Sequence, residues 1–200
     1  MPIYEKNNKR ILHVHIPKTG GSSITQLFRE CGWGIDKWSA DGHGGQHATR
    51  QTWKNWGDFD YIFTVVRHPV FRALSDARGR VKDPKEVDYW VQNWCKESYA
   101  EHGNHNRQMV DFFRGKDGEV FYYNDGVHRD RLTSIACGVG EVFTLEQNFN
   151  DNLEFPHIKG DTYYSHSPSL LSLHTLEIIQ STFKEDMEEF GFHWLGLEDL

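Results

Sequence analysis

Runs of apolar residues along the chain predict strands and helices in alternation. Residues 11–16 (ILHVHI) and 61–67 (YIFTVVR) predict strands, and the second run is apolar enough to be buried on both faces. Apolar residues recur at helical spacing in further segments, namely 22–31, 70–80, 84–101, 106–114, 127–137 and 169–190. This order of elements predicts an α/β fold with a small parallel sheet.

The segments between these elements are less regular. Residues 32–58 are rich in Gly, Trp, His and Asp and are expected to form mostly loop, in which 47–56 could form a short helix. Residues 116–126 resemble a turn, and 141–146 (EVFTLE) predict a strand. No repeat or linker divides the chain, so its 200 residues are expected to form one domain.

Composition narrows the classes of function. The net charge of -7 argues against non-specific binding to nucleic acid. Cys31, Cys95 and Cys137 lie far apart and form no C-x-x-C pair, so neither a disulfide nor a cysteine zinc site is expected, and a reducing compartment fits. The polar N-terminus has no apolar signal segment and no window is long enough to span a membrane, so we expect a cytoplasmic protein.

The motif HVHIPKTGGSSI has the composition of an anion-binding loop. A strand that leads through glycines into a helix directs several backbone N–H groups into one concavity, and the helix N-terminus adds partial positive charge. Gly20 and Gly21 let the backbone approach a ligand, and Lys18 adds a full charge. The hydroxyls of Ser22 and Ser23 can bind an anion or cap the helix. An exposed turn followed by an N-cap serine is the alternative interpretation.

The order of residues in this motif differs from that of the nucleoside-triphosphate P-loop. In G-x-x-x-x-G-K-[ST] the lysine follows the second glycine, whereas Lys18 precedes both glycines. The motif is therefore not a Walker A sequence, and hydrolysis of ATP or GTP is disfavoured.

A second motif, YIFTVVRHPVFRALS, also combines a strand, a basic residue and a helix. Arg67 ends the predicted buried strand, at the position where α/β proteins bind ligands, and Ser75 lies two turns into the helix that follows. Arg72 is a further basic residue of this motif. Because a guanidinium group donates two hydrogen bonds at once, Arg67 suits a phosphate.

Together the two motifs resemble those of sulfotransferases that use 3′-phosphoadenosine 5′-phosphosulfate (PAPS), particularly the carbohydrate sulfotransferase branch. In that family a loop like HIPKTGGTS grips the 5′-phosphosulfate, and a stretch like FVR-x-P-x-x-R-x-x-S grips the 3′-phosphate. This chain has HIPKTGGSS and VVRHPVFRALS, with Ser22 in place of threonine and His68 where the family often has Asp or Asn. Weaker similarity extends over GHGGQHAT, NRQMV, FTLEQ and FKEDMEEFGF.

The resemblance implies a P-loop-like three-layer fold that binds PAPS as donor and releases 3′,5′-adenosine bisphosphate (PAP), with no metal. Its loop residues would bind the 5′-phosphosulfate, and these are Lys18, Thr19, Gly20, Gly21, Ser22 and Ser23. Arg67 and Ser75 would bind the 3′-phosphate. Lys18 would in addition stabilise the charge that develops on the leaving phosphate oxygen during in-line transfer.

The acceptor hydroxyl requires a base, and the resemblance points to a histidine. Members that modify uronic-acid hydroxyls have an HGH-like stretch before the second strand, and here its place is taken by His47, with His43 as second choice. His47 could instead begin or cap a helix. Other members use a glutamate, which leaves Glu30 and Glu146 open.

The remaining aromatic and basic residues support several interpretations. His13 and His15 alternate along the first strand and are interpreted as structural, as are Trp90 and Trp94 at helical spacing. A sugar-stacking platform could instead be formed by residues of the 32–58 segment, namely Trp33, Trp38, Trp53 and Trp56. Lys159 and Tyr163 lie where the family closes over the nucleotide.

The sequence thus predicts a sulfotransferase whose acceptor bears a hydroxyl, with a saccharide as the favoured class and no nucleic-acid or membrane partner. Two alternatives stay open. One is a P-loop nucleotide kinase, which would bind ATP with Mg²⁺, and the other is a non-catalytic module that binds the nucleotide and transfers nothing. Eukaryotic relatives of the branch are usually anchored in the Golgi, and the lack of an anchor here leads us to expect a bacterial or phage protein, or a trimmed chain.

Overall fold

The computed structural model describes residues 1–36, 47, 49, 58–98, 104–114, 118–122, 126–137 and 167–199. The chain packs into two compact units, and each is built from two separate parts of the sequence. The first unit comprises Met1–Val66 and Phe112–Ile158, and the second comprises Arg67–Asp111 and Lys159–Leu200. The single domain expected for residues 1–200 stays a prediction.

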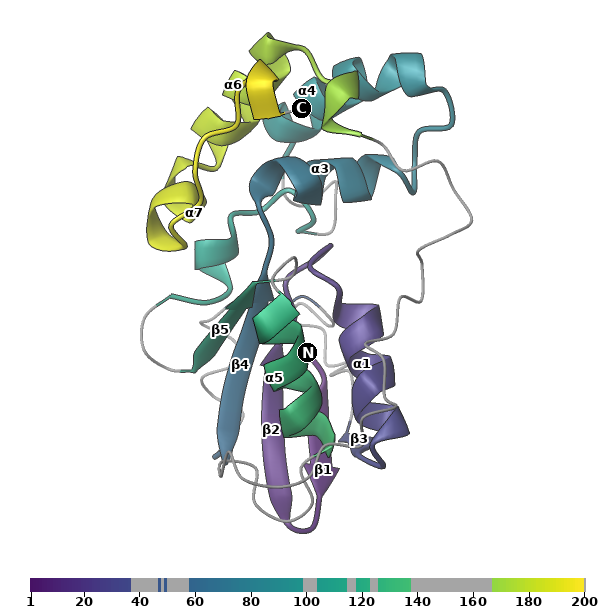
Figure 1. Ribbon diagram of the computed structural model, residues 1–200, viewed down its shortest axis with the longest axis vertical. Helices are drawn as coiled ribbons and strands as arrows, with labels where there is room; N and C mark the ends of the chain where they lie inside the picture. Colours follow the sequence, from purple (N-terminus) through teal and green to yellow (C-terminus); the bar gives the residue numbers. More distant parts are fainter. Residues whose placement is uncertain are drawn as a thin grey trace. The chain divides into compact units, whose positions relative to one another are not determined.

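A five-stranded sheet forms the centre of the first unit (Figure 1). The strand order is β3-β1-β2-β4-β5, and these strands comprise Gly34–Asp36, Ile3–Lys6, Lys9–Val14, Tyr61–Val66 and Glu119–Tyr122. β2, β4 and β5 are mutually parallel, whereas β1 is antiparallel to both of its neighbours. The fold is α/β as expected, but its sheet is mixed rather than purely parallel.

The sequence pattern does not predict β1 or β5. β1 lies in the polar N-terminus and is joined to β2 by Asn7 and Asn8, whose φ angles of 51 and 60° are those of a tight type I′ hairpin turn. β5 lies within 116–126, where a turn is predicted; that prediction is wrong, because a four-residue strand with one fully buried side chain, Phe121, leaves almost no periodic signal. The strand predicted at 141–146 lies outside the described residues.

Helices α1 (Gly21–Glu30) and α5 (Gly126–Cys137) lie side by side on one face of this sheet (Figure 1). Their apolar faces join the strands in one buried core, which comprises Tyr4, Ile11, Ile24, Leu27, Phe28, Trp33, Phe63, Val65, Phe121, Leu132, Ile135 and Ala136. Trp33 was a candidate for a sugar-stacking platform, but it is 4% exposed and its indole N–H donates to the carbonyl of Ala136 at 2.7 Å. It is a core residue.

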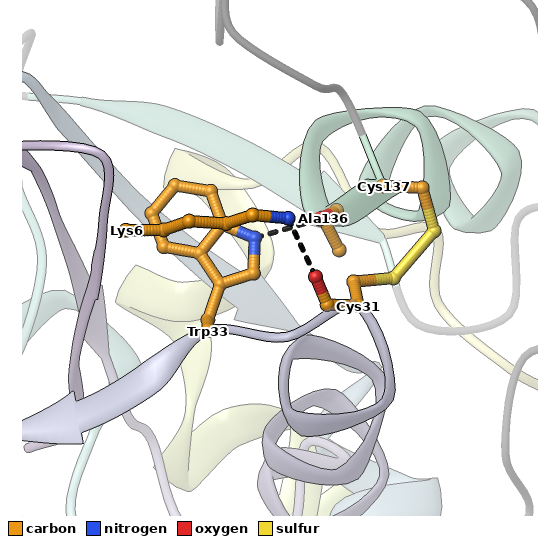
Figure 2. The surroundings of a disulfide bond; sticks show 5 residues. All are labelled: Lys6, Cys31, Trp33, Ala136 and Cys137. Carbon is orange, nitrogen blue, oxygen red and sulfur yellow. Dashed lines mark hydrogen bonds between the residues drawn. A yellow bond between two sulfur atoms is a disulfide. The ribbon is translucent and has the colours of Figure 1, made fainter.

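A disulfide joins Cys31, directly after α1, to Cys137, the last residue of α5 (Figure 2). The two Cα atoms are 5.1 Å apart although 106 positions separate them in the sequence. The expectation of no disulfide is therefore wrong, because the packing of two helices brings together cysteines whose spacing carries no motif. Since disulfides persist mainly in oxidising compartments, the cysteines no longer support a reducing one.

The second unit is helical. Its α-helices are α3 (Pro69–Ala77), α4 (Val87–Lys96), α6 (Leu173–Thr182) and α7 (Lys184–Glu189), and its short 3₁₀ turns are η2 (Pro84–Glu86), η3 (Met109–Asp111), η4 (Pro168–Leu170) and η5 (Leu197–Asp199). The long helix predicted over 169–190 is thus divided at Phe183, whose ψ of 31° ends α6. Phe183 and Trp94 pack in the apolar core of this unit, where Trp94 was expected.

Candidate functional site

The predicted anion loop leaves the sheet at the end of β2, next to the parallel strand β4. Val14 is paired in register with Thr64, whose hydroxyl donates to the carbonyl of Val14 at 2.8 Å. The chain then passes through residues 15–20 and enters α1 at Gly21. The loop therefore stands at the carboxyl edge of parallel strands, where open α/β sheets bind their ligands.

Two residues of the loop adopt left-handed backbone conformations. Lys18 has φ 68° and Gly20 has φ 93°, and such a conformation costs a non-glycine residue about 1–2 kcal/mol. Thr19 between them is fully buried, and its hydroxyl donates to the carbonyl of Ile16 at 2.9 Å. The hydrogen bond of the Thr19 hydroxyl therefore holds the conformation of the loop. Strained backbone of the kind seen at Lys18 is concentrated at functional sites in proteins.

The start of α1 carries no side-chain cap. Its N-cap residue is Gly20, its first turn contains no acidic residue, and its single basic residue near an end, Arg29, lies in the last turn. Ser22 and Ser23 both lie inside the helix, so neither is the N-cap, and Ser22 is exposed while Ser23 is buried. The partial positive charge of the helix start is therefore not offset by a carboxylate of its own first turn.

The position of His15 explains why the first residue of α1 is a glycine. Its imidazole is 5% exposed and lies against Gly21 so closely that a Cβ there would stand 2.6 Å from Cε1. Gly20 thus provides the positive φ expected of the motif, whereas Gly21 provides space for the ring of His15.

The structure places His47 beside the same ring. The ring centroids of His15 and His47 are 4.9 Å apart, and His47 is half-buried. His47, which belongs to the Gly-rich segment, therefore lies near the first turn of α1, with the imidazole of His15 between them. His43 lies outside the described residues.

His13 lies in the interior of the first unit and is not part of the contact between His15 and His47. It is fully buried and stacks on Phe63 with ring centroids 4.7 Å apart, and its Nδ1 bonds the hydroxyl of Tyr4 at 3.2 Å. Burial lowers the pKa of His13 to about 3, so the ring is neutral at physiological pH. This agrees with its structural interpretation.

Glu30 is too far along α1 to act at the loop. It lies nine positions after Gly21, which corresponds to about 14 Å at the rise of an α-helix. Its carboxylate accepts from Gln26 at 2.7 Å on an exposed face. Glu146, the other glutamate considered as a base, lies outside the described residues. The same is true of Lys159 and Tyr163, the candidates for contact with the nucleotide.

The second motif begins with β4 of the first unit, and its residues from Arg67 onward belong to the second unit. Arg67 directly follows β4 and is half-buried, and His68 then caps α3, because its Nδ1 accepts the backbone N–H of Val70 at 3.2 Å. Its Nε2–H donates to the carbonyl of His193 at 2.9 Å. His68 thus performs the N-cap role that Asp or Asn, common at this position in the sulfotransferases, would also perform.

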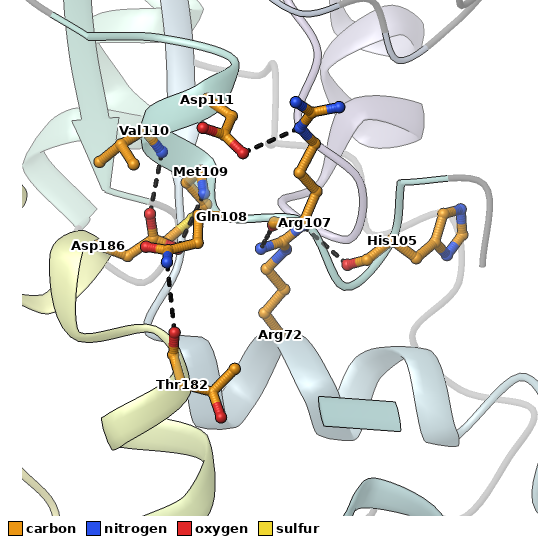
Figure 3. Close-up of polar contacts among 9 residues, drawn as sticks. All are labelled: Arg72, His105, Arg107, Gln108, Met109, Val110, Asp111, Thr182 and Asp186. Atoms are coloured by element: carbon orange, nitrogen blue, oxygen red, sulfur yellow. Dashed lines mark hydrogen bonds and ion pairs between the residues drawn. The ribbon is translucent and has the colours of Figure 1, made fainter. Parts of the chain in front are cut away.

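Arg72 and Ser75 both lie on α3 but in different surroundings. Ser75 is half-buried, whereas Arg72 is fully buried and donates to the carbonyls of Arg107 and His105 at 2.6 and 2.8 Å (Figure 3). Burial lowers the pKa of Arg72 to about 10, which still leaves it charged. Arg72 therefore holds the turn that contains His105 and Arg107.

A comparison of the chain with protein-family models, with curated proteins and with solved structures finds no match in any of the three. Within the part of the chain that the structure describes, no helix has the length and apolar character needed to cross a membrane. Over the same residues, no three His, Cys, Asp or Glu side chains gather as a metal site would require.

Proposed function

We propose that the chain is a sulfotransferase that moves a sulfuryl group from PAPS to a hydroxyl of an acceptor, with a saccharide as the acceptor class. The observation that carries the proposal is the loop between β2 and α1. In this loop Lys18 and Gly20 are left-handed, the start of α1 has no side-chain cap, and the ring of His47 lies against that of His15. These features support a site in which backbone donors, the charge of Lys18 and a histidine base act together. We further propose a P-loop-like core, since the loop joins a strand with a parallel neighbour to a helix.

In the proposed reaction the acceptor oxygen attacks sulfur as the bond from sulfur to the phosphate oxygen breaks. PAP then leaves with the electron pair of that bond on its 5′-phosphate. Lys18 and the backbone N–H groups at the start of α1 stabilise this charge, and His47 takes the proton of the acceptor hydroxyl. Arg67 and Ser75 are assigned to the 3′-phosphate, which distinguishes PAP from AMP.

His15 has a supporting part in this proposal. Its ring lies between Gly21 and His47, so it holds the base against the helix start without contacting the substrate itself. Thr19 contributes through the backbone, because its hydroxyl already donates to Ile16.

Calorimetric titration with PAP, and with ATP plus Mg²⁺ as comparison, tests the proposal. Micromolar PAP binding that is lost in Lys18→Ala and in Arg67→Ala supports it, with the exposed Lys82→Ala and Arg29→Ala as matched controls. Binding of ATP without binding of PAP would instead favour the nucleotide kinase. PAP binding with no sulfate transfer to any hydroxyl acceptor would favour the non-catalytic module.

A further inference from the structure

The segment that follows α7 holds a tryptophan at the surface of the second unit. Gly191, with φ 64°, turns the chain, which then runs back along α6 (Figure 1). Trp194 lies in this segment and is 52% exposed, whereas the next residue, Leu195, is buried. A single exposed apolar side chain is ordinary by itself, but the backbone on both sides of Trp194 is held by buried side chains.

Gln180 and His68 hold this backbone from opposite sides. Gln180, which is 1% exposed on α6, accepts the N–H of Leu195 at 2.6 Å and donates to the carbonyl of Leu195 at 3.1 Å. His68, which is 7% exposed, donates from Nε2 to the carbonyl of His193 at 2.9 Å. The two peptide groups that flank the Cα of Trp194 are therefore both fixed. An indole on such a backbone offers a flat apolar surface that loses little conformational entropy when a ligand binds.

The imidazole of His68 also connects this segment to the second motif. His68 directly follows Arg67, and its Nδ1 accepts the backbone N–H of Val70 as the N-cap of α3. One ring thus bonds both the start of α3 and the carbonyl of His193. Arg67 and Trp194 are each one residue away from the bond between His68 and His193, which places their backbones at the same end of α3.

The chemistry of the donor indicates which group would lie on the indole. In PAP the adenine and the 3′-phosphate are attached to the same ribose, whereas the reacting sulfur of PAPS lies beyond the 5′-phosphate. A nucleotide whose 3′-phosphate is bound by Arg67 therefore has its base at that end of the site and the acceptor hydroxyl at the other end. Adenine has a flat π face, and an exposed aromatic side chain is a surface on which such a base stacks.

We propose that the indole of Trp194 stacks on the adenine of the donor while Arg67 binds the 3′-phosphate. The proposal rests on the function proposed above, and it adds a base-binding residue that neither sequence motif contains. Adenine is favoured over a saccharide here because Trp194 is linked to the residue assigned to the 3′-phosphate, and not to the loop at which transfer would occur.

Calorimetric titration of the full chain with two ligands tests the proposal. One ligand is PAP, and the other is deoxyribose 3′,5′-bisphosphate, which carries two phosphates and no base. We expect Trp194→Ala to weaken PAP binding about 10- to 100-fold, the range that one stacked base contributes, and to leave binding of the base-free ligand unchanged. Trp194→Phe keeps an aromatic ring and should lose less, whereas Arg67→Ala should weaken both ligands. Tyr89→Ala, which removes a 70% exposed aromatic side chain from α4, is the matched control.

The other outcomes are distinct. Equal losses of both ligands in Trp194→Ala would mean that this residue only supports the backbone near Arg67, and would overturn the proposal. Intact PAP binding with a raised KM for a saccharide acceptor would place the acceptor on the indole and overturn it as well. A wild type that binds PAP no more tightly than the base-free ligand would overturn this assignment alone, and one that binds neither would overturn the proposed function too. Thermal melting of each variant shows whether a loss follows from unfolding.

Discussion

The ring of His15 occupies the space in which the side chain of residue 21 would otherwise lie. A Cβ on Gly21 would stand 2.6 Å from Cε1 of that ring and closer still to Nε2. The residue that follows β2 and the first residue of α1 thus fit together only when the second is glycine. The second glycine of the motif is therefore explained by packing, and the first, Gly20, by its φ of 93°.

Gly21→Ala is expected to lower the free energy of unfolding by about 1–3 kcal/mol, the usual cost of overpacking a filled site. The cost should fall sharply when the same change is made in a His15→Ala background, because the ring that blocks the new methyl group is then absent. Denaturant unfolding of the four proteins of this double-mutant cycle measures the difference. Equal costs in both backgrounds would show that His15 does not lie against Gly21.

Replacement of Lys18 separates its backbone strain from its charge. Lys18→Gly is expected to be more stable than Lys18→Ala by about 1 kcal/mol, because only glycine adopts φ 68° without penalty. Both variants should lose PAP binding, since both lack the ammonium group. Urea unfolding and calorimetry measure the two effects. If alanine is the more stable replacement, the left-handed conformation at this position is refuted.

The sequence predicts the helices and strands that contain long runs or repeats of apolar residues. It does not predict short elements that form only beside a neighbouring strand. The run 61–67 and the helical spacing at 22–31 correspond to β4 and α1 within a residue or two. β5 has a single fully buried side chain, and so cannot be recognised before its neighbour β4 is known. The sequence also does not indicate that α6 ends at Phe183 and α7 begins after it, because apolar residues continue at helical spacing across this position.

The candidate site shows the same limit. The glycines and Lys18 could be identified from the motif, because anion loops have a local sequence signature. Arg72 is a basic residue of the second motif, yet it is buried and donates to two carbonyls of a turn more than thirty residues later. The pairing of Asp76 with His105 has no local signature at all, since it joins α3 to a turn 29 residues later. Tertiary contacts of this kind become visible only in the fold.

The disulfide between Cys31 and Cys137 is expected to stabilise the chain by about 2–4 kcal/mol, mainly by restricting the unfolded state. Cys31→Ser or Cys137→Ser should lower the unfolding free energy by that amount, and addition of a reductant should destabilise the wild type but not these two variants. Cys95→Ser is the control, because Cys95 takes no part in the bond. Alkylation of the denatured, unreduced protein should label Cys95 alone. Three labels would show that the disulfide does not form.

The carboxyl group of Asp186 is expected to make stability depend on pH between 4 and 6. It accepts the backbone N–H groups of Met109 and Val110 at 2.8 and 2.9 Å (Figure 3). Burial raises its pKa to about 6, although Arg72 and these N–H groups act in the opposite direction. A raised pKa means that the folded state holds the proton more tightly than the unfolded state. Its contribution is therefore complete below pH 4 and is lost as the pH rises through 6.

Asp186→Asn isolates this contribution, because asparagine does not titrate. The unfolding free energy of the wild type minus that of the variant is expected to fall by about 3 kcal/mol from pH 4 to pH 7, at about 1.4 kcal/mol for each unit of pKa shift. Glu189→Gln, which changes an exposed carboxylate of the same helix α7, serves as the matched control. Urea unfolding at several pH values measures the difference. A difference that grows with pH would mean that Arg72 and the two N–H groups outweigh burial, and that Asp186 is held as a carboxylate.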